Sequence, residues 1–74
     1  MDIDKLIIMA NQIGDFFESW PEPEQAASEV ASHLRRFWAP QMRARLIAHA
    51  RAGGDGLSPL LRKALQSLEA HAPA

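Results

Sequence analysis

The sequence predicts an all-α fold, a compact bundle of three to four short helices. Apolar residues recur at steps of three and four along most of the 74 residues, and no stretch shows the sustained alternation that is typical of a strand. Helix-breaking residues divide this pattern into segments of helical length. No long linker or internal repeat interrupts it, so residues 1–74 are expected to form a single small helical domain. The dividing residues are Pro21, Pro23, Pro40, Pro59 and the glycines at positions 53, 54 and 56.

The first expected helix begins near residue 3 and is ended by Pro21 and Pro23. At about 100° per residue, its apolar stripe covers roughly half of the helix circumference. A stripe this wide predicts packing against more than one neighbour, with most of its aromatic side chains in the core. The stripe consists of Ile3, Leu6, Ile7, Met9, Ala10, Ile13, Phe16, Phe17 and Trp20.

The second expected helix begins at Pro23, because proline in the first turn loses no hydrogen bond. It should stop near Trp38, since Pro40 disfavours helical geometry at the residue before it. Arg35 and Arg36 then lie in its last turn, where positive charge complements the helix dipole. The side chains expected to be buried are Ala27, Val30, Ala31, Leu34, Phe37 and Trp38.

A third helix is expected from about residue 40 to residue 52, with Arg43 and Arg45 on the two flanks of its apolar stripe. The glycines that follow predict a helix stop and a tight connection. Ser58 and Pro59 have the residue types of an N-cap and a first helical position, and they open a leucine-rich fourth helix that fades near His71.

Several functional classes are disfavoured by the composition. The chain has no cysteine, and its three histidines are too scattered to predict a metal site. A domain this small has little room for a water-excluding catalytic cleft, so we expect no catalysis by this chain alone. The acidic start and the short apolar runs predict neither a secretory signal nor a membrane span. A cytoplasmic protein with no membrane association is therefore expected.

Charge is distributed unevenly along the chain. Residues 1–32 contain seven carboxylates against one lysine, whereas residues 33–51 contain five arginines and no carboxylate. Either the acidic half lies against the basic segment within the fold, or an anionic partner neutralises the arginines. The first interpretation needs no partner and is the default.

The basic segment is also the best candidate for recognition. Arginine presents a planar fork of donors to carboxylates or phosphates, and arginines beside large aromatics are enriched at interfaces. A helix that stops abruptly before Pro40 is expected to leave part of the Trp38 ring exposed as an anchor. The residues predicted to bind a partner are His33, Arg36, Trp38, Pro40, Arg43 and Arg45.

Three stretches of the sequence resemble a known family in the same order. They are Met-Ala-Asn-Gln-Ile-Gly-Asp-Phe-Phe at residues 9–17, His-Leu-Arg-Arg-Phe-Trp-Ala-Pro-Gln-Met-Arg at residues 33–43, and Gly-Gly-Asp-Gly-Leu-Ser-Pro-Leu at residues 53–60. Together they resemble the delta subunit of soluble, NAD-dependent, molybdenum-containing formate dehydrogenases. The middle stretch is the most specific. The positions that carry the likeness are Asn11, Gln12, Ile13, Phe16, Phe17, His33, Arg35, Arg36, Phe37, Trp38, Pro40, Met42 and Arg43.

The resemblance implies a small non-catalytic subunit of a cytoplasmic complex. It implies a large alpha subunit as partner, carrying bis-molybdopterin guanine dinucleotide and iron–sulfur clusters, and a flavin elsewhere in the complex. No cofactor is expected on this chain itself. The implied role is support of assembly, of molybdenum-cofactor loading or of stability.

Two other hypotheses remain open from the sequence. In the first, Arg35, Arg36, Arg43 or Arg45 grips the phosphates of a guanine dinucleotide. Exposed amides at the start of the last helix would offer a further anion site. In the second, two helices meeting at a proline corner imitate a nucleic-acid-binding motif, which the acidic first helix and the net charge of −1 oppose.

Overall fold

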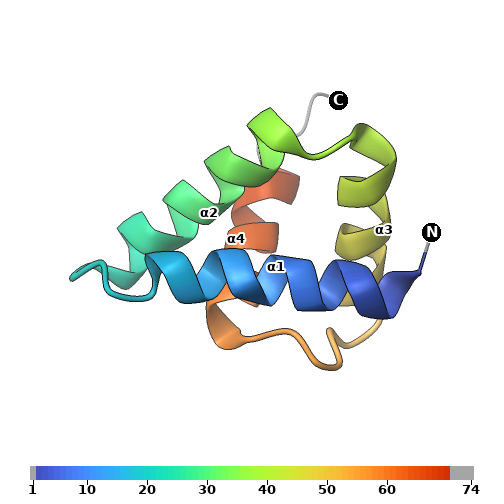
Figure 1. Ribbon diagram of the computed structural model, residues 1–74, viewed down its shortest axis with the longest axis horizontal. Helices are drawn as coiled ribbons and strands as arrows, with labels where there is room; N and C mark the ends of the chain where they lie inside the picture. Colours follow the sequence, from blue (N-terminus) through green and yellow to red (C-terminus); the bar gives the residue numbers. More distant parts are fainter. Residues whose placement is uncertain (1, 71–74) are drawn as a thin grey trace.

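The computed structural model describes residues 2–70 and contains, within that range, four α-helices and no strand. The helices are α1 (Ile3–Phe17), α2 (Pro23–Phe37), α3 (Pro40–Arg51) and α4 (Pro59–Ala70). Figure 1 shows α1 crossing in front of the other helices, with α4 behind it. The predicted all-α bundle is confirmed. The fading of the last helix at His71 was predicted for residues outside the described range.

The helix ends follow the predicted local chemistry. Ser58 Oγ accepts a hydrogen bond from the Leu61 amide at 3.2 Å, so the predicted N-cap of α4 is confirmed. Prolines occupy the first positions of α2 and α3. The connection after α3 needs glycine, since φ is 124° at Gly53 and 67° at Gly54, a region that side chains with a Cβ rarely adopt.

The core lies where α2 and α4 pack against each other beneath α1. At Gly14, α1 approaches α4 so closely that an added Cβ would overlap Leu61 Cδ2. This contact explains a glycine inside a helix, where it otherwise weakens the structure. The buried core cluster consists of Leu6, Ala10, Ala27, Val30, Ala31, Leu34, Trp38, Leu46, Leu57, Leu61, Ala64, Leu65 and Leu68.

Phe16 and Phe37 differ from their predicted environment. Both were predicted to be core and are 77% and 72% exposed, whereas Trp38 is buried as predicted for its helix face, at 7% exposed, without the partly exposed ring that was expected of an anchor. α2 ends at Phe37, and Trp38 takes an extended backbone with φ −95° and ψ 141°, so its ring packs into the core cluster. Phe37 lies on the same side of α2 as the buried Val30 but is the last residue of the helix, and Phe16 lies beside the exposed Met9 at the edge of the α1 stripe.

The glycine connection is held in place by side chains from three helices. Asn11 of α1 donates from Nδ2 to the Gly56 carbonyl at 2.9 Å and accepts from the Ser58 amide at 3.1 Å. Arg62 of α4 donates to the carbonyls of Leu57 and Gly54, at 3.3 and 3.0 Å. His49 Nε2 of α3 lies 2.7 Å from the Asp55 carbonyl oxygen. These bonds join α1, α3 and α4 at one end of the bundle.

Asn11→Ala is expected to destabilise the chain by about 1 kcal/mol, because two hydrogen bonds are lost while alanine improves the helix propensity of α1. Chemical denaturation measures the change, and amide hydrogen exchange should show faster exchange at Ser58. The neighbouring Gln12→Ala is a matched control, since Gln12 is exposed and forms none of these bonds. Equal stability of the two variants would contradict a clamping role for Asn11.

Candidate docking surface

Aromatic side chains from α1, from the turn after it and from α2 form, together with Met9, one continuous and partly exposed surface, which we call the aromatic face. It comprises Met9, Phe16, Phe17, Trp20, His33 and Phe37. The Phe17 ring is central, with centroids 5.0 Å from Phe16, 6.3 Å from Trp20 and 6.4 Å from His33. The His33 ring lies 4.8 Å from Phe37 and so extends the surface to the end of α2.

A shallow hollow of about 470 Å³ lies within the aromatic face. Its walls are mostly apolar, with Gln12 and His33 as the polar members. Trp38 belongs to the core and contributes to the surface only by lining this hollow. Its apolar lining residues are Met9, Ile13, Phe16, Phe17 and Trp38.

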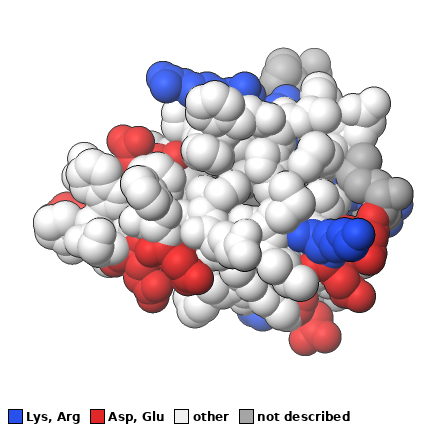
Figure 2. Space-filling model, viewed as in Figure 1, with Lys and Arg blue, Asp and Glu red and all other residues white. Residues whose placement is uncertain are grey.

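The space-filling view shows this side of the molecule as a broad uncharged area (Figure 2). Lysine and arginine side chains border it at the top and right, and carboxylates gather at the left, lower and right edges, including beside the basic side chain at the right (Figure 2). Exposed, contiguous apolar area rimmed by charge is typical of a protein-interaction site. The aromatic face is therefore the candidate docking surface of the structure.

Arg43, predicted to contact a partner or a phosphate, is half-buried and engaged within the chain. Its Nη1 group donates to the carbonyl oxygens of Trp38, Arg35 and Leu34, at 2.5, 3.2 and 3.3 Å. The carbonyls of Arg35 and Trp38 lie at or just beyond the C-terminal end of α2, where backbone groups lack helical partners, whereas the Leu34 carbonyl also accepts from the Trp38 amide. Arg43 therefore fastens the start of α3 to the end of α2. Sequence spacing gave no signal for this contact.

The remaining predicted site residues are separated in space. Arg36 is exposed beside Phe37, and His33 lies inside the aromatic face. Arg35 lines a different, polar hollow with Ser32 of α2 and Ser67 of α4. Pro40 and Arg45 are exposed on α3. Of the predicted partner-binding residues, His33 lies in the aromatic face and Arg36 lies beside it, whereas Trp38 and Arg43 make contacts within the chain.

Two ion pairs among residues 2–70 test whether the acidic half of the chain neutralises the basic segment. Lys63 Nζ lies 2.6 Å from Glu24 Oε1, and Arg51 pairs with Glu69. Neither pair joins a carboxylate of residues 1–32 to an arginine of residues 33–51. These contacts therefore give no support to internal neutralisation of the basic segment by the acidic half.

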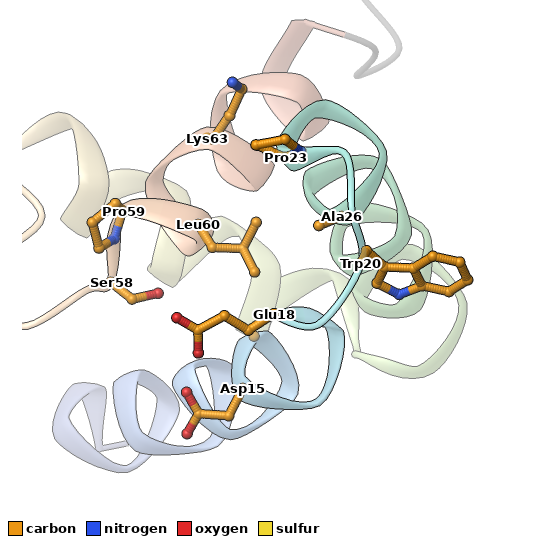
Figure 3. Close-up of a pocket in the computed structure, with 10 residues that line it drawn as sticks. Asp15, Glu18, Trp20, Pro23, Ala26, Ser58, Pro59, Leu60 and Lys63 are labelled. Carbon is orange, nitrogen blue, oxygen red and sulfur yellow. The ribbon is translucent and has the colours of Figure 1, made fainter.

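A second hollow, of about 420 Å³, lies between the C-terminal end of α1 and the start of α4. The carboxylates of Asp15 and Glu18 point toward Ser58, and the indole of Trp20 points away (Figure 3). Within residues 2–70, no group of three or more histidine, aspartate or glutamate side chains is placed to hold a metal. The two acids are therefore best described as a charged rim.

The start of α4 offers few free donors for an anion. The Ser58 amide donates to Asn11, the Leu61 amide donates to the Ser58 hydroxyl, and Pro59 has no amide hydrogen. With Arg43 also engaged, no observation in the described part of the chain favours a nucleotide phosphate site. Binding of a guanine dinucleotide stays an untested prediction.

The structure is that of a small helical protein with an exposed aromatic face. Residues 5–65 match the family model of the NADH-dependent formate dehydrogenase delta subunit FdsD, and the chain belongs to this family. The match confirms the resemblance noted in the sequence and implies partner subunits in a formate dehydrogenase complex. Neither curated proteins nor solved structures give a match.

The helices between residues 2 and 70 are all too short or too polar to cross a membrane.

Proposed function

We propose that this chain is a non-catalytic accessory subunit that binds the large molybdenum-containing alpha subunit and stabilises the assembled formate dehydrogenase. Membership of the delta subunit family supports a place in that complex. In this proposal the molybdenum cofactor, the iron–sulfur clusters and the flavin are held by other subunits. The absence of cysteine fits a reducing, cytoplasmic setting for the complex.

The exposure of Phe16 and Phe37 is the observation that carries the proposal. Both rings are more than 70% exposed on the same side of a 74-residue chain. Burying a ring of this size against a partner gains about 1.5–3 kcal/mol. Arginine and aromatic side chains together dominate interface energetics, so Arg36 beside Phe37 fits the same role. The proposed docking surface is therefore the aromatic face with Arg36, in place of a surface centred on Trp38.

Co-expression with the other formate dehydrogenase subunits tests this proposal. The unmodified chain is expected to co-purify in stoichiometric amount, and Phe16→Ala combined with Phe37→Ala should reduce the retained amount at least about tenfold, since two ring contacts are lost. Circular dichroism of the free variant should show an unchanged helical fold, because both rings are exposed in it.

Ile8→Ala is the matched control. Ile8 is an exposed apolar residue of α1, 57% accessible, that does not line the hollow. This variant should co-purify like the unmodified chain. If the double phenylalanine variant were retained as well as the control, docking through the aromatic face would be refuted. Failure of the unmodified chain to co-purify would refute the accessory-subunit role itself.

A further inference from the structure

The aromatic face has the shape of a socket for one bulky side chain. Its hollow is open to solvent and is walled by Met9, Ile13 and Phe16 on α1 and by His33 on α2. The hollow extends from Met9 to Phe16, which is about 10 Å along the axis of α1. An aromatic or large aliphatic side chain fits this length and this apolar lining.

Cations lie at two ends of the socket. Lys5 precedes Met9 by four residues on α1, so the two side chains are neighbours on the helix surface. Arg36 follows His33 by three residues on α2 and is adjacent to Phe37. Both Lys5 and Arg36 are exposed, and neither forms a hydrogen bond or an ion pair with any residue between positions 2 and 70.

The contacts of Arg43 explain why Arg36 forms no hydrogen bond or ion pair within residues 2–70. Arginines at the end of a helix often bond its last carbonyls. Here Arg43 takes that position from α3, binding the carbonyls of Leu34, Arg35 and Trp38. The guanidinium of Arg36 is therefore left with its full set of donors, which match a carboxylate in a two-pronged geometry.

We propose that this face receives a segment of a larger formate dehydrogenase subunit in which a bulky apolar side chain is flanked by carboxylates. The apolar side chain enters the hollow, one carboxylate pairs with Arg36, and another lies near Lys5. This inference rests on the proposed function and specifies the chemistry of the partner segment. It also places that segment along a line between the end of α2 and the start of α1.

Charge disfavours a second copy of this chain as the occupant. In a two-fold dimer the same surface meets itself, and none of the residues that form the aromatic face or line its hollow is a carboxylate that could pair with Arg36. Each hollow would also have to receive a side chain from the other face, whereas a partner that carries carboxylates neutralises Arg36 and Lys5. Charge complementarity thus points to a different chain.

Affinity for the remaining subunits, purified together without this chain, tests the charge prediction. Arg36→Glu is expected to weaken binding at least about tenfold, because it places a carboxylate against a carboxylate. Arg35→Glu is the matched control, since Arg35 is the adjacent exposed arginine but faces the polar hollow beside Ser67. The control should change the affinity less than about threefold, as expected of a charge at or outside the rim.

Zero-length carbodiimide cross-linking of the assembled complex identifies the partner segment. Arg36→Lys keeps the positive charge and supplies an amine, so the expected product links this position to an aspartate or glutamate beside a bulky apolar residue of a larger subunit. Arg35→Lys should give no such product. Cross-links from position 36 to a second copy of this chain would overturn the inference.

The outcomes separate this inference from the proposed function. Stoichiometric co-purification combined with equal affinities of Arg36→Glu and Arg35→Glu would leave the accessory role standing and refute the acidic partner segment. Loss of co-purification by the unmodified chain would refute both. Reduced binding by Arg36→Glu with a carboxylate cross-link at position 36 supports both.

Discussion

Trp38→Ala is expected to destabilise the free chain by about 3–5 kcal/mol, the usual loss when a large buried aromatic is truncated to alanine. The Trp38 ring is 7% exposed and belongs to the core cluster. A domain of 74 residues has a total stability of roughly 4–11 kcal/mol, so the variant should be unfolded or close to it. Thermal denaturation followed by circular dichroism should show a melting temperature lower by more than about 15 °C.

Phe37→Ala is the control for this variant because it removes the neighbouring aromatic side chain, which is 72% exposed. Its stability should stay within about 1 kcal/mol of the unmodified chain, as is usual for exposed positions. Comparison of the two variants distinguishes a role in packing from a role in docking. Trp38→Ala should lose the fold, whereas Phe37→Ala should lose only partner binding. A folded Trp38→Ala variant that fails to bind the complex would instead restore Trp38 as the docking anchor.

Arg43→Ala is expected to lower stability by about 2 kcal/mol, because hydrogen bonds from a charged donor contribute more than neutral ones. Three carbonyls at the end of α2 lose their common donor. The corner between α2 and α3 should loosen, and the melting temperature should fall by about 10 °C. Arg43→Lys should recover only part of the loss, since an ammonium lacks the planar arrangement of donors.

Arg36→Ala serves as the matched control for Arg43→Ala. Arg36 is an exposed arginine at the same corner and has no hydrogen bond or ion pair in residues 2–70. Its removal should cost less than about 1 kcal/mol, the usual range for a charge that only complements a helix dipole. Urea denaturation of both variants gives the comparison. Equal stabilities would show that the carbonyl contacts of Arg43 contribute nothing to the fold.

Most of the fold was predictable because its signals are local. Prolines at the first positions of α2, α3 and α4 fix where those helices begin, and the glycines after α3 supply backbone angles that other residues rarely adopt. The Ser58 cap was likewise predictable, since a capping side chain bonds an amide three residues away. Each of these signals lies within a few residues of the feature that it specifies.

The docking surface was only partly predictable, because exposure depends on where neighbouring helices end. Periodicity gives the angle of a side chain around its helix, which correctly placed Leu34 and Leu61 in the core. Periodicity does not show how far a neighbouring helix extends, and therefore whether it covers a given side chain. Phe16 and Phe37 were therefore predicted as core and are exposed, and the part of the Trp38 ring that was expected at the surface is buried with the rest of it.

The sequence by itself determined the four helices, their order and the family, because these depend on local propensity and on residue patterns. The tertiary structure alone decided the roles of the polar and aromatic side chains. Asn11 reaches a loop 45 residues away, and Arg43 reaches back across a corner to the end of α2. Such contacts depend on how helices pack. The same packing leaves Arg36 and Phe37 exposed, whereas Trp38 is buried and Arg43 is engaged by carbonyls of the chain.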